Sequence, residues 1–107
     1  METLEFALEG RRQAPEFEAV LVGVVGSGNL EVLVENGPDP ARCTYSIHTS
    51  AVGFGTIWAA VIQSFQARHQ LGGLAVSIND MGATPAVVSL RLDQAAASIP
   101  HIAGLGS

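Results

Sequence analysis

Apolar residues recur at every second position in several short segments, and this pattern constrains the fold more than any other feature of the chain. Leu4, Phe6 and Leu8 alternate with residues 3, 5 and 7, and the same period returns further along the sequence. A period of two places one face of a β-strand on a core and the other toward solvent. This period predicts strands at residues 4–8, 30–35, 43–48, 74–78 and 86–92, and a run rich in β-branched residues predicts a sixth at 17–25.

One segment has a helical period instead. Its apolar face recurs at spacings of three and four residues, through Trp58, Val61, Ile62, Phe65 and His69. This spacing is typical of an amphipathic helix. We expect this helix to have residue 56, a threonine, as its N-cap and to stop at the glycine pair 72–73, and a short second helix over residues 93–98.

The order of these elements, β-β-β-β-α-β-β with short connections, favours an α+β fold. We expect a mainly antiparallel sheet with one principal helix packed on a face. At 107 residues the chain fits a single domain, which we place at residues 1–98. Pro100 and the glycine-rich ending predict a flexible tail over residues 99–107.

A short glycine-rich turn, Gly26-Ser27-Gly28-Asn29, separates the second and third expected strands. Glycine and asparagine tolerate the positive φ angles of hairpin turns, so Ser27 should lie at a hairpin tip. The turn has two interpretations: a hairpin and nothing more, or a modification site whose serine hydroxyl is open to another protein.

The common catalytic and cofactor motifs fail at this turn. A hydrolase nucleophile elbow needs Gly-x-Ser-x-Gly before a helix, and a P-loop needs a lysine, which the whole chain lacks. Where a dinucleotide fingerprint needs its third glycine, the chain has Glu31.

The sequence also gives no sign of a metal site. The three histidines, His48, His69 and His101, lack metal-ligand spacing, and the single cysteine, Cys43, is expected to be a half-buried residue of a strand.

Composition narrows the function classes further. A net charge of −5 argues against nucleic-acid binding. The longest apolar run, residues 19–25, is too short to cross a membrane, and acids stand where a secretory signal would carry basic residues, so we expect a cytoplasmic protein. Eight of the ten acids fall within the first 39 residues, which fits either solvated strand faces or an acidic docking surface.

Several stretches resemble the acyl carrier (delta) subunits of malonate decarboxylases. They are Val-Val-Gly-Ser-Gly-Asn-Leu-Glu-Val-Leu at 24–33, Thr-Ser-Ala at 49–51 with Trp58, Asp-Met-Gly-Ala-Thr-Pro at 80–85, and Leu-Arg-Leu-Asp at 90–93. Their order and spacing extend the resemblance from about residue 2 to residue 95. Asn29 stands where we associate aspartate with this motif, which keeps the turn propensity and removes a charge. The acyl carrier (gamma) subunit of citrate lyase is the alternative.

The resemblance implies a noncatalytic carrier. Its Ser27 would hold 2′-(5″-phosphoribosyl)-3′-dephospho-coenzyme A through a phosphodiester, with Gly26, Gly28 and Asn29 forming the attachment turn. The thiol of this arm would carry acetyl and malonyl thioesters between an acyl transferase subunit and decarboxylase subunits, after a prosthetic-group transferase has installed it. Partner or arm contacts are expected at the residues Glu31, Asp80, Gly82 and Thr84.

A different class of function stays open beside this one. The chain could be a noncatalytic interaction or regulatory module whose acidic strands bind a partner and whose turn is only a turn. Replacement of Ser27 separates the two hypotheses, because the module would keep its function without the hydroxyl. A stand-alone hydrolase, the third hypothesis, predicts turnover of simple esters, and we expect none.

Overall fold

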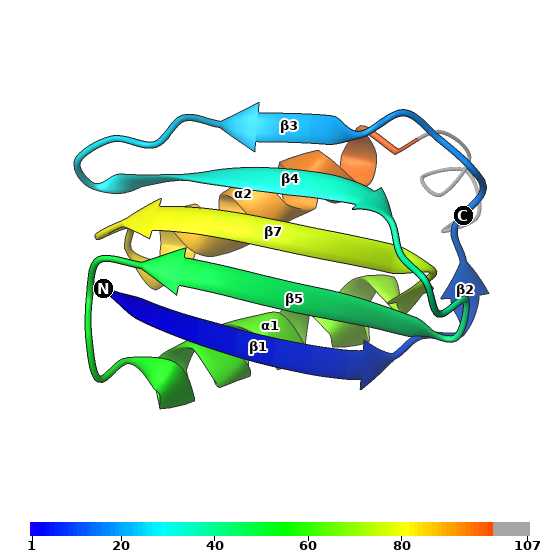
Figure 1. Ribbon diagram of the computed structural model, residues 1–107, viewed down its shortest axis with the longest axis horizontal. Helices are drawn as coiled ribbons and strands as arrows, with labels where there is room; N and C mark the ends of the chain where they lie inside the picture. Colours follow the sequence, from blue (N-terminus) through cyan, green and yellow to red (C-terminus); the bar gives the residue numbers. More distant parts are fainter. Residues whose placement is uncertain (100–107) are drawn as a thin grey trace.

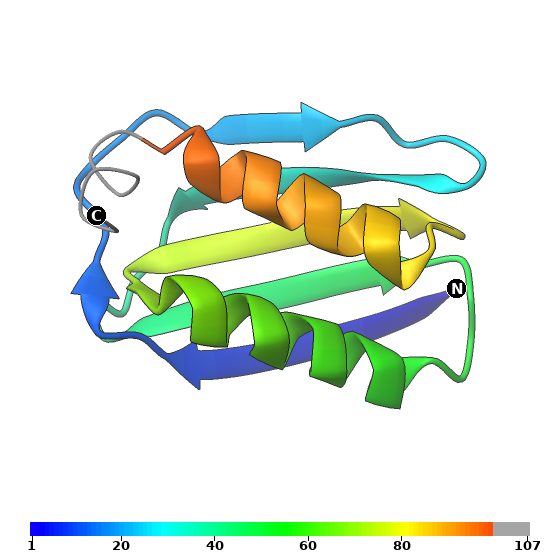
Figure 2. The same cartoon turned by 180° about the vertical axis from the view of Figure 1, so that it is seen from behind.

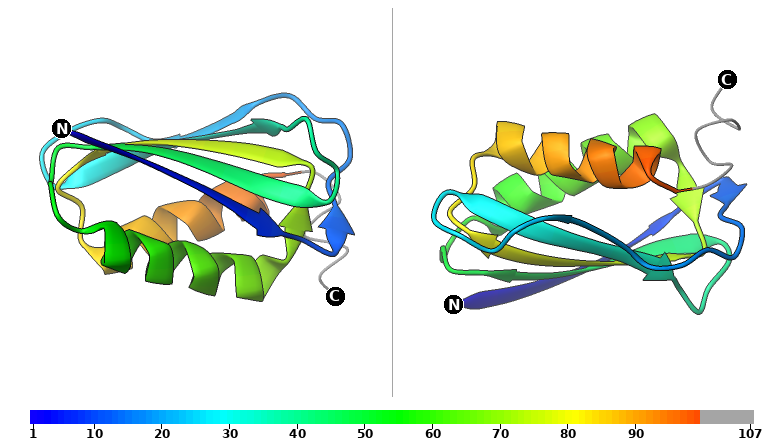
Figure 3. Two further views of the ribbon diagram at one scale, coloured as in Figure 1. Left: turned by 60° about the horizontal axis from the view of Figure 1, so that its bottom comes forward. Right: turned by 90° about the horizontal axis from the view of Figure 1, so that it is seen from above.

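The computed structural model describes residues 1–99, which form two layers. One layer is a five-stranded sheet, and the other consists of two helices that cover the same face of the sheet (Figures 1 and 2). The views in Figure 3 show the sheet and the helix pair as separate layers, with the opposite sheet face uncovered. The sheet strands are β1 (Glu2–Glu9), β3 (Val20–Gly23), β4 (Asn29–Asn36), β5 (Arg42–Thr49) and β7 (Leu74–Met81).

The strands lie in the order β1-β5-β7-β4-β3. Three neighbouring pairs are antiparallel, and only β5 and β7 run parallel, because the chain between them crosses over through α1 (Gly55–His69). This architecture confirms the predicted α+β class and the mainly antiparallel sheet. A separate two-residue parallel pair, β2 (Arg12–Gln13) with β6 (Leu71–Gly72), lies outside the six predicted strands.

Most strands match their predicted positions, and their ends differ for local reasons. The second expected strand, residues 17–25, is shorter as β3, and it ends at Gly23 because that residue has a φ of 81° and leaves the extended conformation. The fifth continues through Asn79 to Met81, so the connection to the next element is shorter than predicted. Cys43 is fully buried rather than half-buried.

The principal helix, α1, confirms the predicted apolar face. Trp58, Ile62 and Phe65 are buried against the sheet. Its ends differ from expectation. Phe54 occupies the N-cap without a side-chain hydrogen bond, so residue 56 is not the cap, and the helix stops at Gln70, whose φ is 52°, before the glycine pair.

The sixth predicted strand is wrong, because residues 85–97 form a second helix, α2 (Pro85–Ala97). Alternation through residue 92 suggested a strand, but Leu90 is exposed. The face that packs on the sheet has helical spacing, and its buried members are Val88, Leu92, Ala95 and Ala96. The expected short helix over residues 93–98 is the last part of α2.

Two further observations concern the chain end and membranes. Ile99 is 2% exposed and belongs to the core, so this first residue of the expected tail is packed. The rest of that prediction, residues 100–107, lies outside the described residues. Neither helix within residues 1–99 is long and apolar enough to span a membrane.

Candidate functional site

Ser27 lies at the tip of the β3–β4 hairpin, as the sequence predicted. The amide of Asn29 donates to the carbonyl of Gly26 at 2.9 Å, which closes a four-residue turn. Gly28 has a φ of 71° at the third position, the pattern of a type II turn. Ser27 and Gly28 are exposed, and a methyl group built on Gly26 or Gly28 would meet nothing within 4 Å. The hydroxyl therefore stands in open space.

The turn is anchored to the sheet and to α2 on either side of the serine. The amide of Gly28 donates to the carbonyl of Met81, at the end of β7, at 2.8 Å. The side-chain oxygen of Asn29 accepts from the amide of Leu30 at 2.8 Å and from Nε of Arg91, on α2, at 3.4 Å. An exposed hydroxyl on a tethered turn suits a residue that other proteins must reach repeatedly.

Three connections meet at the Ser27 end of the sheet (Figure 1): the hairpin turn, the β5–α1 loop and the β7–α2 loop. Asp80 joins two of them. Its carboxylate accepts from the hydroxyl of Thr49 at 2.9 Å and from the amides of Gly82 and Ala83 at 3.2 and 3.0 Å. Its carbonyl accepts from the amide of Ser50 at 3.1 Å. Asp80 thus organises the surroundings of the turn.

The four residues that we expected to contact the arm or a partner lie in different structural settings. Asp80 is 5% exposed with both oxygens engaged, which supports a structural role. Thr84 is the N-cap of α2, where its side chain accepts from an amide, and Gly82 is exposed with a φ of 80°. Glu31 lies on the uncovered sheet face, where Oε1 accepts from Asn79 at 3.2 Å. Contacts with an arm or partner remain predictions for all four.

Two of the three histidines and the cysteine lie in structural positions within residues 1–99. His48 contacts Thr3 on the uncovered sheet face, and His69 bonds to Asp93 at 2.9 Å. His101 falls outside the described residues. Burial raises the pKa of the Cys43 thiol to about 11, although its hydrogen bond with a neighbouring tyrosine acts in the opposite sense. Within residues 1–99 no cluster of His, Cys, Asp or Glu could hold a metal ion.

Sequence reasoning missed the apolar character of the Ser27 end. Large apolar side chains are exposed there on the hairpin connection, on the β5–α1 loop, at the end of β7 and on the first turn of α1. They are Val24, Val25, Val52, Phe54, Ile57 and Met81. These residues come from separate segments of the sequence, so the apolar patch that they form in the fold could not be predicted from any one segment.

A small apolar pocket opens between the first turns of α1 and α2 at this same end. Its volume is about 190 Å³. Apolar side chains make up most of its wall, among them Phe54, Ile57, Trp58, Val61, Ala83 and Val88. The single charged residue in the wall is Asp80.

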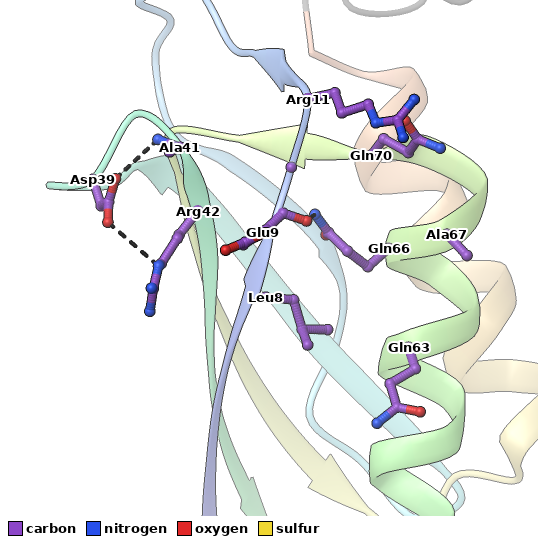
Figure 4. Close-up of a pocket in the computed structure, with 11 residues that line it drawn as sticks. Leu8, Glu9, Arg11, Asp39, Ala41, Arg42, Gln63, Gln66, Ala67 and Gln70 are labelled. Carbon is purple, nitrogen blue, oxygen red and sulfur yellow. Dashed lines mark hydrogen bonds and ion pairs between the residues drawn. The ribbon is translucent and has the colours of Figure 1, made fainter.

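A larger and more polar pocket, of about 830 Å³, lies at the other end of the sheet, and Figure 4 shows the residues that line it. Glu9, Arg11 and Gln66 are among its lining residues. Arg42 and Asp39 pair with each other at 3.7 Å on its rim. The side-chain amide of Gln66 donates to the backbone carbonyls of Glu9 and Leu71, so this glutamine links the segments that form the pocket wall. Nothing in this pocket is a strong nucleophile.

The arrangement at Ser27 favours modification over catalysis. No described side chain hydrogen bonds to its hydroxyl, whereas a nucleophilic serine needs an adjacent base. An exposed hydroxyl on a tethered turn is instead a suitable acceptor for a group that another enzyme transfers.

The chain is similar to known proteins over most of its length. Residues 18–99 match the family model described as malonate decarboxylase delta subunit (MdcD). A malonate decarboxylase acyl carrier protein of Burkholderia cepacia is 62% identical over 99 residues, covering 92% of this chain and 91% of the relative. One of Xanthomonas euvesicatoria pv. vesicatoria is 57% identical over 96 residues, covering 89% and 91%.

A solved structure shares the fold. It is a chain from the crystal structure of a Pseudomonas malonate decarboxylase hetero-tetramer in complex with malonate. The two chains are 38% identical with a TM-score of 0.80, over 89% of this chain and 95% of that one. The matched family and these relatives are of the malonate decarboxylase type, which favours it over the citrate lyase alternative.

Proposed function

The chain belongs to the malonate decarboxylase delta subunit family, whose members are acyl carrier proteins, and we propose that Ser27 is its prosthetic-group attachment site. The attached group is 2′-(5″-phosphoribosyl)-3′-dephospho-coenzyme A, joined to the serine oxygen through a phosphodiester. The observation that carries this proposal is the open position of the Ser27 hydroxyl on its glycine-flanked turn.

The residues around Ser27 fit such a group. A bulky phosphodiester meets no obstruction at Gly26 or Gly28, where even an added methyl group has open space. Its negative charge remains in water, which avoids the cost of burying a charge. Arg91, which already reaches Asn29, is a cation close to the turn. When attached, the group supplies a thiol that forms acyl thioesters.

The protein body then has two tasks: to hold the arm and to present it. Tethering gives the thioester a high effective concentration at each partner's active site. The partners are an acyl transferase subunit, decarboxylase subunits and a prosthetic-group transferase, all in the cytoplasm. The exposed apolar patch around the turn is a surface that such partners could cover. The carrier itself catalyses no step.

Reconstitution of the decarboxylase complex tests this function. We expect Ser27→Ala to abolish malonate-dependent release of CO2, because no thioester can form. Ser50→Ala is the matched control, since Ser50 is also an exposed serine at the same end and we expect it to keep full turnover. A Ser27→Ala complex with full activity would instead favour the noncatalytic interaction module.

A further inference from the structure

We propose that the apolar pocket between the first turns of α1 and α2 binds the acetyl thioester end of the arm and excludes the malonyl thioester end. This inference rests on the proposed attachment at Ser27. It concerns a different part of the chain, however, and it assigns a resting place that depends on the acyl group carried.

The pocket adjoins the attachment turn through the backbone. Gly28 is hydrogen-bonded to Met81, and the next residues after Met81, Gly82 and Ala83, belong to the pocket wall. The hairpin turn and the first turns of α1 and α2, which flank the pocket, lie at the same end of the sheet (Figure 1), so the arm and the pocket would share that end. By contrast, the larger polar pocket, whose lining Figure 4 shows, is formed by the end of β1, the start of β5 and the end of α1, at the opposite end.

The size and lining of the pocket suit a short apolar thioester. An apolar protein cavity of about 150 Å³ holds benzene, a molecule with six heavy atoms. The pocket here is about 190 Å³, and an acetyl group with its sulfur and the two adjoining methylene carbons also has six heavy atoms. Ile57, Trp58 and Val88 provide the apolar contacts that such a group needs.

The malonyl end carries an additional carboxylate, and the pocket has no partner for it. Its wall contains no arginine or histidine, and its single charged residue is the acidic Asp80. The oxygens of Asp80 already accept from Thr49, Gly82 and Ala83. Burying an unpaired carboxylate is costly, and a second negative charge beside it adds repulsion.

Tethering makes even weak binding effective. A group on a short flexible linker experiences an effective concentration on the order of millimolar, so a site with a dissociation constant in that range is about half occupied. The acetyl arm would then rest in the pocket, shielded from water. The malonyl arm would remain outside, available to the decarboxylase subunits.

The first experiment needs no attached arm. Soluble S-acetyl-N-acetylcysteamine and S-malonyl-N-acetylcysteamine are titrated separately into the full-length Ser27→Ala chain. We expect the acetyl probe to shift the methyl resonances of Ala83 and Val88 and the indole resonance of Trp58, the chain's single tryptophan, with saturation in the millimolar range. The malonyl probe should shift them at least about tenfold less at equal concentration. Equal shifts, or no shifts, would overturn the proposal.

The second experiment uses the modified protein, with the arm verified by intact mass. Hydroxylamine cleavage of its acetyl and malonyl thioesters is compared with cleavage of the same thioesters of free coenzyme A. We expect about twofold protection of the acetyl thioester alone, the value that half occupancy of the pocket gives. If the mass shows no arm, the proposed attachment fails while the probe titration still decides the pocket. A present arm without acetyl protection contradicts the pocket proposal.

Two variants sharpen the outcome. Ala83→Leu fills the pocket and should remove the acetyl protection. Ile57→Arg places a cation at the rim, where Ile57 is already 46% exposed, and should extend protection to the malonyl thioester. Leu90→Arg is the matched control, because Leu90 is 51% exposed on α2 outside the pocket wall and should change neither. Equal effects of the two arginine variants would contradict the proposal.

Discussion

The hydroxyl of Thr49 donates a 2.9 Å hydrogen bond to Oδ2 of Asp80, and both side chains are buried at the end of the sheet that carries Ser27. Thr49 is the last residue of β5 and Asp80 the second-last of β7. The bond therefore ties together the two parallel strands at the point where their loops diverge toward the helices. The same carboxylate holds the start of the β7–α2 loop.

Asp80→Ala should lower the free energy of unfolding by about 2–3 kcal/mol, because it leaves the buried Thr49 hydroxyl without its acceptor and frees two loop amides. Urea denaturation measures this loss. Thr49→Val is the milder counterpart, since it removes the donor and leaves Asp80 its two amide partners. A loss below about 0.5 kcal/mol for Asp80→Ala would show that water replaces these bonds at no cost.

Gly28→Ala should destabilise the chain by about 1 kcal/mol, because the φ of 71° at this position strains a residue with a side chain. Open space surrounds the added methyl group, so strain is the only cost. Gly26→Ala is the control from the same turn, with equal space and no positive φ, and should be neutral or slightly stabilising. Chemical denaturation of both variants checks this, and equal losses would mean that backbone conformation is not the cause.

Cys43 should resist thiol reagents in the folded protein. Burial raises the pKa of its thiol from 9.0 to about 11, so little thiolate exists near neutral pH. We expect modification at least about tenfold slower than in the unfolded chain, measured by absorbance with an aromatic disulfide. In the modified protein the arm thiol should therefore react with the reagent well before Cys43 does.

The same shift in the pKa of Cys43 makes stability depend on alkaline pH. The unfolded chain releases the thiol proton near pH 9.0, whereas the folded chain retains it up to about pH 11. The contribution of Cys43 is therefore complete below pH 9.0 and is lost as pH rises through this window. Cys43→Ala should flatten the decline in unfolding free energy.

Asp93 should make the packing of α1 on α2 sensitive to acid. Partial burial alone would raise the pKa of Asp93, but hydrogen bonds from His69 and Arg68 outweigh it and hold the pKa below 3.8. A carboxyl group whose pKa is lower in the folded chain stabilises the fold at pH values above its pKa in the unfolded chain. This stabilisation is lost as the pH falls through the pKa of the folded chain. Unfolding free energies of wild type and Asp93→Asn should therefore converge below pH 3.8; a gap that widens there would contradict this.

The sequence predicted what depends on local patterns. Alternation located the four long strands, a run of β-branched residues located β3, and glycine with asparagine located the Ser27 turn. The same local reasoning failed for α2. Val88 and Leu92 are four residues apart, a spacing that fits both a strand and a helix. Leu90 between them completes an alternating pattern, which predicted a strand. Thr84 as N-cap and Pro85 at the helix start were the contrary signal.

The surroundings of Ser27 depend on pairings between distant segments. Met81 reaches Gly28 because β7 inserts between β4 and β5, an order that alternation within single strands does not specify. The role of Asp80 follows from the same insertion, which brings Thr49 beside it. The apolar pocket forms only because α2 is a helix beside α1. Since residues 86–92 were predicted as a strand, the pocket could not be predicted from the sequence.

Intact-mass measurement of the chain purified from its native host, followed by fragmentation, tests the attachment at Ser27 most directly. We predict a mass increase equal to phosphoribosyl-dephospho-coenzyme A, located on the peptide that contains Ser27 and absent from Ser27→Ala. Ser50→Ala should retain the full increase. An unmodified chain isolated from an active decarboxylase complex would contradict the attachment.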